Sequence, residues 1–229
     1  MEFAEWEPVY EAVLADFGYS RAGDEAARDL LADLLDGEPL DAATLSLGGT
    51  VAVVAPGPSL AAERERGRAR SADAVVAAST AADRLADAGV AVDVQVTDLD
   101  GDPARATRRT REGTPVAVHA HGDNRNALRA TVPDCRADRL LPTTQAAPAG
   151  VVRNVGGFTD GDRAAFLADA RGADRLRFVG WDVDADVAPE KRRKLRWAVR
   201  LLRWLERRRG DRFPLLDGRR DDLEPVPTG

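Results

Sequence analysis

Short apolar runs alternate with helical segments along most of the chain, and this alternation constrains the fold more than any other feature. The first run, residues 50–55 (TVAVVA), is apolar and rich in β-branched side chains, as expected for a strand that is covered on both faces. Similar runs recur at residues 74–77, 92–97, 115–118, 140–141, 151–155 and 176–179. The pattern predicts βαβ units and an α/β fold, with a mainly parallel sheet of about six or seven strands flanked by helices.

Helical spacing of apolar residues predicts the remaining elements. The expected helices cover residues 6–17, 24–36, 59–68, 80–88, 103–111, 124–131, 160–171 and 190–208. We expect a helical N-terminal segment over residues 1–48, an α/β catalytic domain over 49–216 and a C-terminal tail over 217–229, which is poor in apolar residues. The two N-terminal helices are open to three interpretations: a cap over the pocket, a homodimer contact or packing against the sheet.

Composition and charge exclude several classes of protein. The chain has 229 residues, with 33 Lys and Arg against 39 Asp and Glu, so its net charge of −6 offers no general attraction to nucleic acid or to an anionic membrane. No run is long and apolar enough for a transmembrane helix, and the start of the chain lacks the basic and apolar parts of a secretory signal. Cys135 is the only cysteine, which excludes an internal disulfide. We therefore expect a cytoplasmic protein without nucleic-acid or membrane partners.

Ligands of parallel sheets bind beyond the carboxyl ends of the strands, so the residues after each apolar run are the first to inspect. Gly57 and Ser59 follow the first run; the glycine permits backbone amides to approach a phosphate, although a plain turn explains it equally well. Asp98 and Asp100 follow the third run at alternate positions, where both carboxylates can face one Mg²⁺. An ordinary turn is the alternative, and Asp102 is then the natural N-cap of the next helix.

Both histidines of the chain lie at the end of the fourth run, in residues 119–124 (HAHGDN). We expect His121, Asp123 and Asn124 to form a polar lip that hydrogen-bonds a substrate or orients a metal-bound water, with His119 packed beneath. Zinc is a weaker alternative because no thiolate is near. The structural alternative is a helix capped by Asp123, with two bystander histidines.

A glycine pair precedes the helix expected at residues 160–171. Gly156 and Gly157 permit a close backbone approach, and Thr159 can cap the helix while presenting its hydroxyl to a ligand. Asp160 and Asp162 follow in the first turn, so this loop is a candidate site for a nucleotide or a metal.

Two further features have alternative interpretations. Trp181 and Asp182 follow the last apolar run; they can stack on and hydrogen-bond a flat heterocycle, although core packing of Trp181 is slightly favoured. The longest expected helix, residues 190–208, has an apolar stripe and many arginines, which favours a solvated face over phosphate binding. Whether Arg192, Arg193 or Arg196 reaches a phosphate stays open.

Four motifs in one order carry a resemblance to a known family. They are GPSL at 57–60, TDLDGD at 97–102, HAHGDN at 119–124 and GGFTDGDRA at 156–164. Together they resemble the archaeal 6-hydroxymethyl-7,8-dihydropterin pyrophosphokinases, the MptE-like group, whose fold is similar to the catalytic domain of thiamine pyrophosphokinases. The resemblance implies an ATP-dependent diphosphotransferase that uses Mg²⁺ to transfer diphosphate from ATP to the hydroxymethyl group of a reduced pterin, releasing AMP, in folate or tetrahydromethanopterin-type cofactor synthesis.

The chemistry of such a transfer gives each motif an expected role. Mg²⁺ would lie between Asp98, Asp100 and the β- and γ-phosphates, while His121 or Asp123 would orient or deprotonate the attacking hydroxyl. The residues expected to bind substrate or nucleotide are Gly57, Ser59, Asn124, Gly156, Gly157, Thr159, Asp160, Asp162, Trp181 and Asp182. Two other functions stay open: a nucleotide-sugar glycosyltransferase, since an Asp-x-Asp pair also binds a metal and a sugar diphosphate, and a noncatalytic nucleotide-binding module.

Overall fold

A single parallel sheet organises residues 1–228, which are the residues that the computed structural model describes. Its six strands lie in the order β5-β4-β3-β2-β1-β6, and every neighbouring pair is parallel. The strands are β1 (Thr50–Val54), β2 (Ala74–Ala78), β3 (Val94–Thr97), β4 (Val116–Ala120), β5 (Leu140–Thr144) and β6 (Arg175–Val179). The expected α/β class is therefore confirmed.

The expected strand at residues 151–155 is wrong. This segment makes only isolated bridges, between Thr143 and Arg153 and between Ala149 and Val152. Asn154 then donates its side-chain amide to the carbonyls of Gln145 and Ala146, which holds the chain in a turn beyond the end of β5. The segment consequently leaves the sheet after one bridge.

Eight α-helices surround the sheet in the described part of the chain. They are α1 (Phe3–Phe17), α2 (Arg21–Asp33), α3 (Glu63–Arg70), α4 (Ala81–Asp87), α5 (Pro103–Arg111), α6 (Arg125–Thr131), α7 (Asp160–Ala170) and α8 (Pro189–Arg209). The single helix expected over 59–68 is wrong: a 3₁₀ turn, Pro58–Ala61, precedes α3, and Ala62 between them is extended, with φ −75° and ψ 135°.

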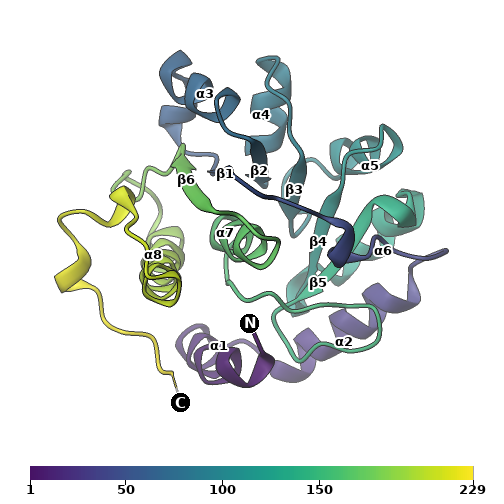
Figure 1. The fold of residues 1–229 in the computed structure, drawn as a ribbon. Helices are drawn as coiled ribbons and strands as arrows, with labels where there is room; N and C mark the ends of the chain where they lie inside the picture. Colours follow the sequence, from purple (N-terminus) through teal and green to yellow (C-terminus); the bar gives the residue numbers. More distant parts are fainter. Residues whose placement is uncertain (229) are drawn as a thin grey trace.

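Helices cover both faces of the sheet (Figure 1). Alternate residues of each strand point to opposite faces, so Val51 and Val53 of β1 pack with α1, α7 and α8, whereas Ala52 and Val54 pack with α3 and α4. Helices α2, α5 and α6 share a third cluster with β4 and β5. Strands β1 to β5 are buried on both faces, apart from Thr50, and so read as largely apolar runs, whereas the edge strand β6 exposes Arg175.

The N-terminal helices pack against the sheet. Trp6 and Tyr10 of α1 are 1% and 0% exposed and belong to the same core as β1 and α7. Helix α2 contacts β4 and β5 at the edge of the sheet. Of the three interpretations of these helices, packing against the sheet is therefore observed.

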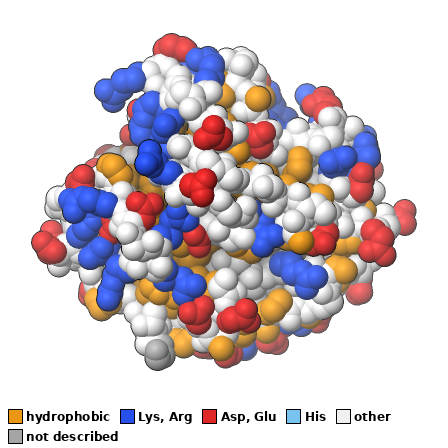
Figure 2. All heavy atoms as spheres, viewed as in Figure 1, with side chains coloured by type: hydrophobic (Ala, Val, Ile, Leu, Met, Phe, Trp, Pro, Cys, Tyr) orange, Lys and Arg blue, Asp and Glu red, His pale blue; other side chains and the backbone are white. Residues whose placement is uncertain are grey.

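Basic and acidic side chains alternate over the surface, and the basic ones gather over α8 and the C-terminal segment (Figure 2). Many of these arginines form ion pairs, such as Arg219 with Asp184 and Arg220 with Glu206. The segment after residue 216 also contributes Val226 to the core. No helix within residues 1–228 combines the length and apolar character needed to cross a bilayer.

Candidate active site

A cavity of about 470 Å³ opens at the carboxyl edge of the sheet. Its walls are the loops after all six strands, the turn between α1 and α2, the first turn of α7 and the first two turns of α8. This is the edge at which parallel sheets bind ligands, and the volume is in the range typical of small-molecule sites. The topology thus brings together the strand ends that carry the sequence motifs.

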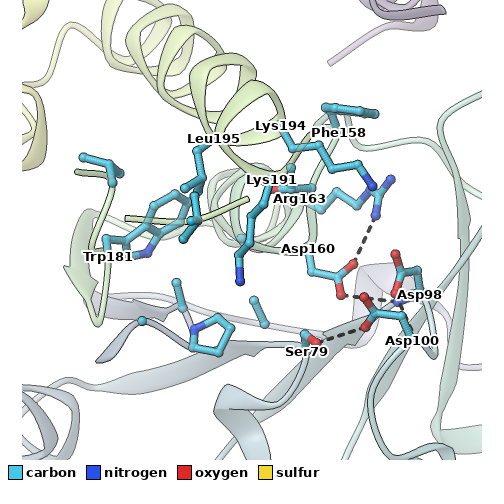
Figure 3. A pocket seen from close by; sticks show the side chains of 18 of the residues that line it. Ser79, Asp98, Asp100, Phe158, Asp160, Arg163, Trp181, Lys191, Lys194 and Leu195 are labelled. Carbon is cyan, nitrogen blue, oxygen red and sulfur yellow. Dashed lines mark hydrogen bonds and ion pairs between the residues drawn. The ribbon is translucent and has the colours of Figure 1, made fainter. Parts of the chain in front are cut away.

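Three carboxylates meet inside this cavity. Asp98 and Asp100 follow β3, and Asp160 is the first residue of α7; one ligand atom from each lies within 4.8 Å of the other two. Figure 3 shows the three side chains turned toward one another. We call these residues the acidic triad. Carboxylate oxygens in such a cluster are the ligands that Mg²⁺ prefers.

The backbone beside the acidic triad is strained. Ser79 and Leu99 are the two non-glycine residues with positive φ in the described chain, at 48° and 69°. Ser79 donates its hydroxyl to Asp100 over 3.2 Å, and Leu99 separates the two aspartates of β3, where the Asp100 amide donates to Asp98 over 3.2 Å. Such conformations cost about 1–3 kcal/mol each and concentrate at functional sites.

Negative charge exceeds positive charge at the acidic triad. Arg163 pairs with Asp160 at 3.1 Å and is the cation in direct contact with the cluster. Burial and the neighbouring charge of Asp98 raise the pKa of Asp100, and raise that of Asp160 well above its ordinary value. Burial also opposes ionisation of Asp98, but hydrogen bonding to His121 and the charge of Arg163 outweigh it and hold its pKa well below the usual range. A divalent cation would relieve this imbalance.

The loop after β4 holds His121 beside the acidic triad. Its Nε2 lies 3.6 Å from the Asp98 carboxylate, and its Nδ1 accepts a hydrogen bond from the Asp123 amide over 3.4 Å. Asn124 is buried and donates its amide to the carbonyls of Asp98 and His119, which ties the ends of β3 and β4 together. His119 is 2% exposed and bonds Thr143, so its expected place beneath the lip is confirmed.

Most of the residues selected from the sequence meet at the cavity. Those that line it are Gly57, Asp98, Asp100, His121, Asp123, Thr159, Asp160, Trp181 and Asp182. Those that do not line it are Ser59, Asn124, Gly156, Gly157 and Asp162. The second group serves the architecture of the loops, as the contacts of its members show.

The loop before α7 uses its glycines and Asp162 for packing and capping. Asp162 is fully buried and accepts hydrogen bonds from the amides of Phe158 and Thr159 and from the Thr159 hydroxyl. Gly157 has a φ of 93°, and a Cβ there would lie 2.7 Å from the backbone of Arg163. The glycine pair therefore permits close packing of the loop on α7. The space beside these glycines is filled by the protein's own chain rather than by a ligand.

The loops after β1 and β6 pack closely on each other. A Cβ on Gly57 would collide with the carboxylate of Asp182 and with the carbonyl of Gly180. The Ser59 amide donates to the same Asp182 carboxylate over 2.8 Å. Trp181 donates its indole N–H to the Val53 carbonyl over 3.1 Å, and its ring still lines the cavity. The ring also packs edge-on against Phe178, with centroids 5.6 Å apart.

Sequence reasoning missed the two lysines of the site. Lys191 and Lys194, which are the only lysines of the chain, both line the cavity from α8. Figure 3 shows Lys191 reaching in between Trp181 and Asp160. The rarity of lysine in an arginine-rich chain and the helical spacing of the pair were the available signals. Arg192, Arg193 and Arg196 are not among the lining residues; the first pairs with Asp186 and the second with Asp16.

Comparison with known proteins gives concordant matches. The sequence model of a family described as 6-hydroxymethylpterin diphosphokinase MptE-like matches residues 31–187. A 6-hydroxymethyl-7,8-dihydropterin pyrophosphokinase of Methanothermobacter thermautotrophicus is 38% identical over 225 residues, covering 90% of this chain and 96% of that protein. Proteins of the same name from Pyrococcus furiosus and Methanocaldococcus jannaschii are 36% and 30% identical, covering 90% and 80% of this chain and 95% and 80% of their own lengths.

Proposed function

The chain belongs to the MptE-like family of 6-hydroxymethylpterin diphosphokinases, and we propose that it transfers diphosphate from ATP to the hydroxymethyl group of 6-hydroxymethyl-7,8-dihydropterin in a Mg²⁺-dependent reaction that releases AMP. The observation that carries this proposal is the opposition, across one cavity, of the acidic triad and the two lysines of α8. In this proposal the product enters folate or tetrahydromethanopterin-type cofactor synthesis in the cytoplasm.

The reaction exchanges one phosphorus–oxygen bond for another. The oxygen of the acceptor hydroxymethyl group bonds to the β-phosphorus, the bond from that phosphorus to the oxygen bridging to the α-phosphorus breaks, and AMP leaves with the bridging oxygen. The acceptor hydroxyl loses its proton. Little covalent chemistry falls to the protein, so positioning and electrostatic stabilisation account for most of the catalysis.

The donor set of the acidic triad fits Mg²⁺. Asp98, Asp100 and Asp160 offer hard oxygen ligands from two segments of the chain, and within residues 1–228 Arg163 is the one arginine or lysine that pairs with them. When bound, Mg²⁺ would neutralise charge on the triphosphate oxygens and so favour attack at phosphorus. The protein fixes these carboxylates in advance through the Ser79 hydroxyl and the loop after β3.

The lysines of α8 supply positive charge to the phosphates. Lys191 has no carboxylate within ion-pair distance among the described residues, whereas Lys194 lies 3.5 Å from Glu190 in an exposed pair. An ammonium is a compact charge that can follow a phosphate group as it moves between donor and acceptor. We assign Lys191 to contact with the transferred diphosphate.

His121 is our candidate to orient the acceptor hydroxyl. The hydrogen bond from the Asp123 amide and the proximity of Asp98 fix its ring at the lip of the cavity. Because Nδ1 already accepts from the Asp123 amide, the ring can donate its Nε2–H to the hydroxyl oxygen and hold it toward phosphorus, and the proton of the hydroxyl then passes to water or to the exposed Asp123 carboxylate. Asp123 is exposed at the same lip and is the second candidate.

A coupled assay for AMP tests the proposal. The protein is incubated with ATP, Mg²⁺ and one of three additions: 6-hydroxymethyl-7,8-dihydropterin, thiamine or no acceptor. We expect AMP release that depends on the pterin and is abolished by chelating the metal. AMP formation with thiamine alone would reassign the acceptor, and the absence of AMP in every arm would reject the kinase. Turnover of a nucleotide sugar in its place would support the glycosyltransferase alternative.

A further inference from the structure

A second cavity of about 340 Å³ adjoins the first on the side of the N-terminal helices. It lies between the turn joining α1 to α2 and the loop after β4, and Asp24, Gly122 and Arg125 are among its lining residues. Tyr19, His121, Asp123 and Gln145 line both cavities. The two cavities therefore meet beside the acidic triad, because His121 contacts Asp98.

The wall of the second cavity is held by buried hydrogen bonds. Asp24 is 2% exposed and accepts from the Gly122 amide over 2.8 Å, the Tyr10 hydroxyl over 2.9 Å and the Gln145 amide over 2.7 Å. Gly122 also packs closely on Gly23, where a Cβ would lie 3.4 Å from the Gly23 backbone. This network fixes the α1–α2 turn against the loop that carries His121.

Charge distinguishes the two cavities. The larger one contains both lysines of the chain and Arg163, and its acidic triad is the proposed site of a divalent cation, whereas the charged residues of the second, Asp24, Asp123 and Arg125, include no lysine and no carboxylate cluster. Arg125 is turned toward the Gly122 carbonyl, to which it donates over 3.2 Å. A triphosphate is disfavoured beside these carboxylates and favoured beside the lysines. The second cavity suits a ligand without negative charge that donates hydrogen bonds.

Two side chains at the junction are available to such a ligand. Tyr19 presents an aromatic ring that is fixed by stacking on Phe17, with ring centroids 5.3 Å apart. Asp123 is exposed, and its carboxylate has no hydrogen-bond partner among the described residues. An aromatic side chain and a free carboxylate together match a flat heterocycle with N–H groups on its edge.

We propose that the second cavity is the acceptor subsite, in which Tyr19 and Asp123 bind the pteridine ring and direct its hydroxymethyl group toward His121 and the acidic triad. The inference rests on the proposed function. It gives the N-terminal helices a direct part in substrate binding, and Tyr19 and Asp24 precede residue 31, where the match to the family model begins. The nucleotide then occupies the larger cavity, beside the lysines.

Steady-state kinetics of paired variants test this assignment. Tyr19→Ala and Asp123→Asn should each raise the KM for the pterin about tenfold, the effect of one lost contact of about 1.4 kcal/mol, and leave the KM for ATP within about twofold. Lys191→Ala, at the other cavity, should show the converse. Tyr19→Phe keeps the ring and its packing, and it should recover most of the pterin affinity that Tyr19→Ala loses.

Equilibrium dialysis separates binding from turnover. The pterin is dialysed against each variant with α,β-methylene-ATP, in which the bond to be broken is replaced, and we expect the Kd for the pterin to rise by the same factor as the KM. A rise in the KM for ATP in Tyr19→Ala, or unchanged pterin affinity in both variants while the wild type still releases AMP, would overturn the subsite and leave the proposed function standing. Absence of AMP release by the wild type would overturn both.

Discussion

The carboxylate of Glu206 and the carboxylates of the acidic triad have opposite surroundings. Glu206 of α8 is 1% exposed and accepts hydrogen bonds from the Phe213 amide over 2.7 Å, from Arg220 over 2.7 Å and from Arg203. The acidic triad concentrates three carboxylates around one arginine, Arg163. Glu206 therefore has two arginines to itself, whereas the three carboxylates of the acidic triad share one arginine.

Glu206 and Asp160 differ in pKa accordingly, whereas the pKa of Asp98 is lowered, like that of Glu206, by donors that face it, His121 and Arg163. Burial raises the pKa of Glu206, but hydrogen bonds from Arg220 and Phe213 outweigh burial and lower it below its usual value. Burial raises the pKa of Asp160, and the charge of Asp98 raises it further. Around Glu206 the protein itself supplies the hydrogen-bond donors that stabilise the charge. Around the acidic triad it supplies too few cations, and this deficit favours binding of a cation from solution.

The largest effect is expected at the acidic triad. Asp98→Asn removes a negative charge from the proposed metal site, so kcat should fall at least about a thousandfold, or about 4 kcal/mol of transition-state stabilisation. The melting temperature should change little, because losing the contacts of Asp98 with His121 and Arg163 is offset by relief of the repulsion that raises the pKa of Asp100 and of Asp160. Kinetics and thermal unfolding of the same preparation measure both quantities.

A variant in the same motif provides the control. Asp102 is exposed and caps α5 by accepting from the Arg105 amide over 3.3 Å, and asparagine caps helices about as well as aspartate. Asp102→Asn should therefore retain full activity. If Asp98→Asn loses fold and activity together, the acidic triad has a structural role like that of Glu206, and the proposed difference between the two sites is wrong.

The converse result is expected at Glu206. Glu206→Gln removes the buried carboxylate that pairs with Arg220 and Arg203, leaving Arg220 with Asp217 alone, and should lower the free energy of unfolding by about 2 kcal/mol, while kcat of the folded enzyme stays the same. Chemical denaturation measures the loss. Glu224→Gln is the matched control, since that exposed side chain lies 3.8 Å from Arg200 and its pair should contribute little. Equal stability of the two variants would contradict the structural role of Glu206.

Stabilisation of the protein by Mg²⁺ should depend on the acidic triad and not on Glu206. A ligand that binds only the folded state and is present at a concentration of about 100 times its Kd adds about 2.7 kcal/mol of stability. Mg²⁺ should therefore raise the melting temperature of the wild type and of Glu206→Gln by similar amounts. Asp160→Asn should show little of this rise. Differential scanning calorimetry with and without the metal tests the expectation, which fails if Asp160→Asn responds like the wild type.

The sequence was sufficient to predict the sheet and part of the site. Buried parallel strands leave continuous apolar runs, and Asp98 and Asp100 stand at the end of such a run, so topology alone places them at the binding edge. Local chemistry also predicts that Thr159 and Asp162 cap α7, since both lie at the helix start. These features depend on neighbours in the chain.

Other features depend on distant segments and could not be predicted. Lys191 enters the cavity because of how α8 is rotated against the sheet, and nothing local to α8 specifies that rotation. The sequence around Gly57 suits a phosphate, but in the fold the Asp182 carboxylate fills the space beside this glycine. Tyr19 reaches the loop after β4 through the packing of α2 on that loop, in which Asp24 binds Gly122.

The smallest effect is a pH dependence of stability at Glu206. Its pKa in the folded protein lies below the ordinary value of 4.5, so ionised Glu206 contributes stability that is complete above about pH 5 and is lost as the pH falls through the folded pKa. Glu206→Gln has no such carboxylate. The difference in unfolding free energy between wild type and variant should therefore be constant from pH 5 to pH 8 and shrink below pH 4.5. Denaturation curves over this range measure it; a difference that grows on acidification would mean that Glu206 is neutral in the folded protein, and the contrast with the acidic triad would then rest on hydrogen bonding alone.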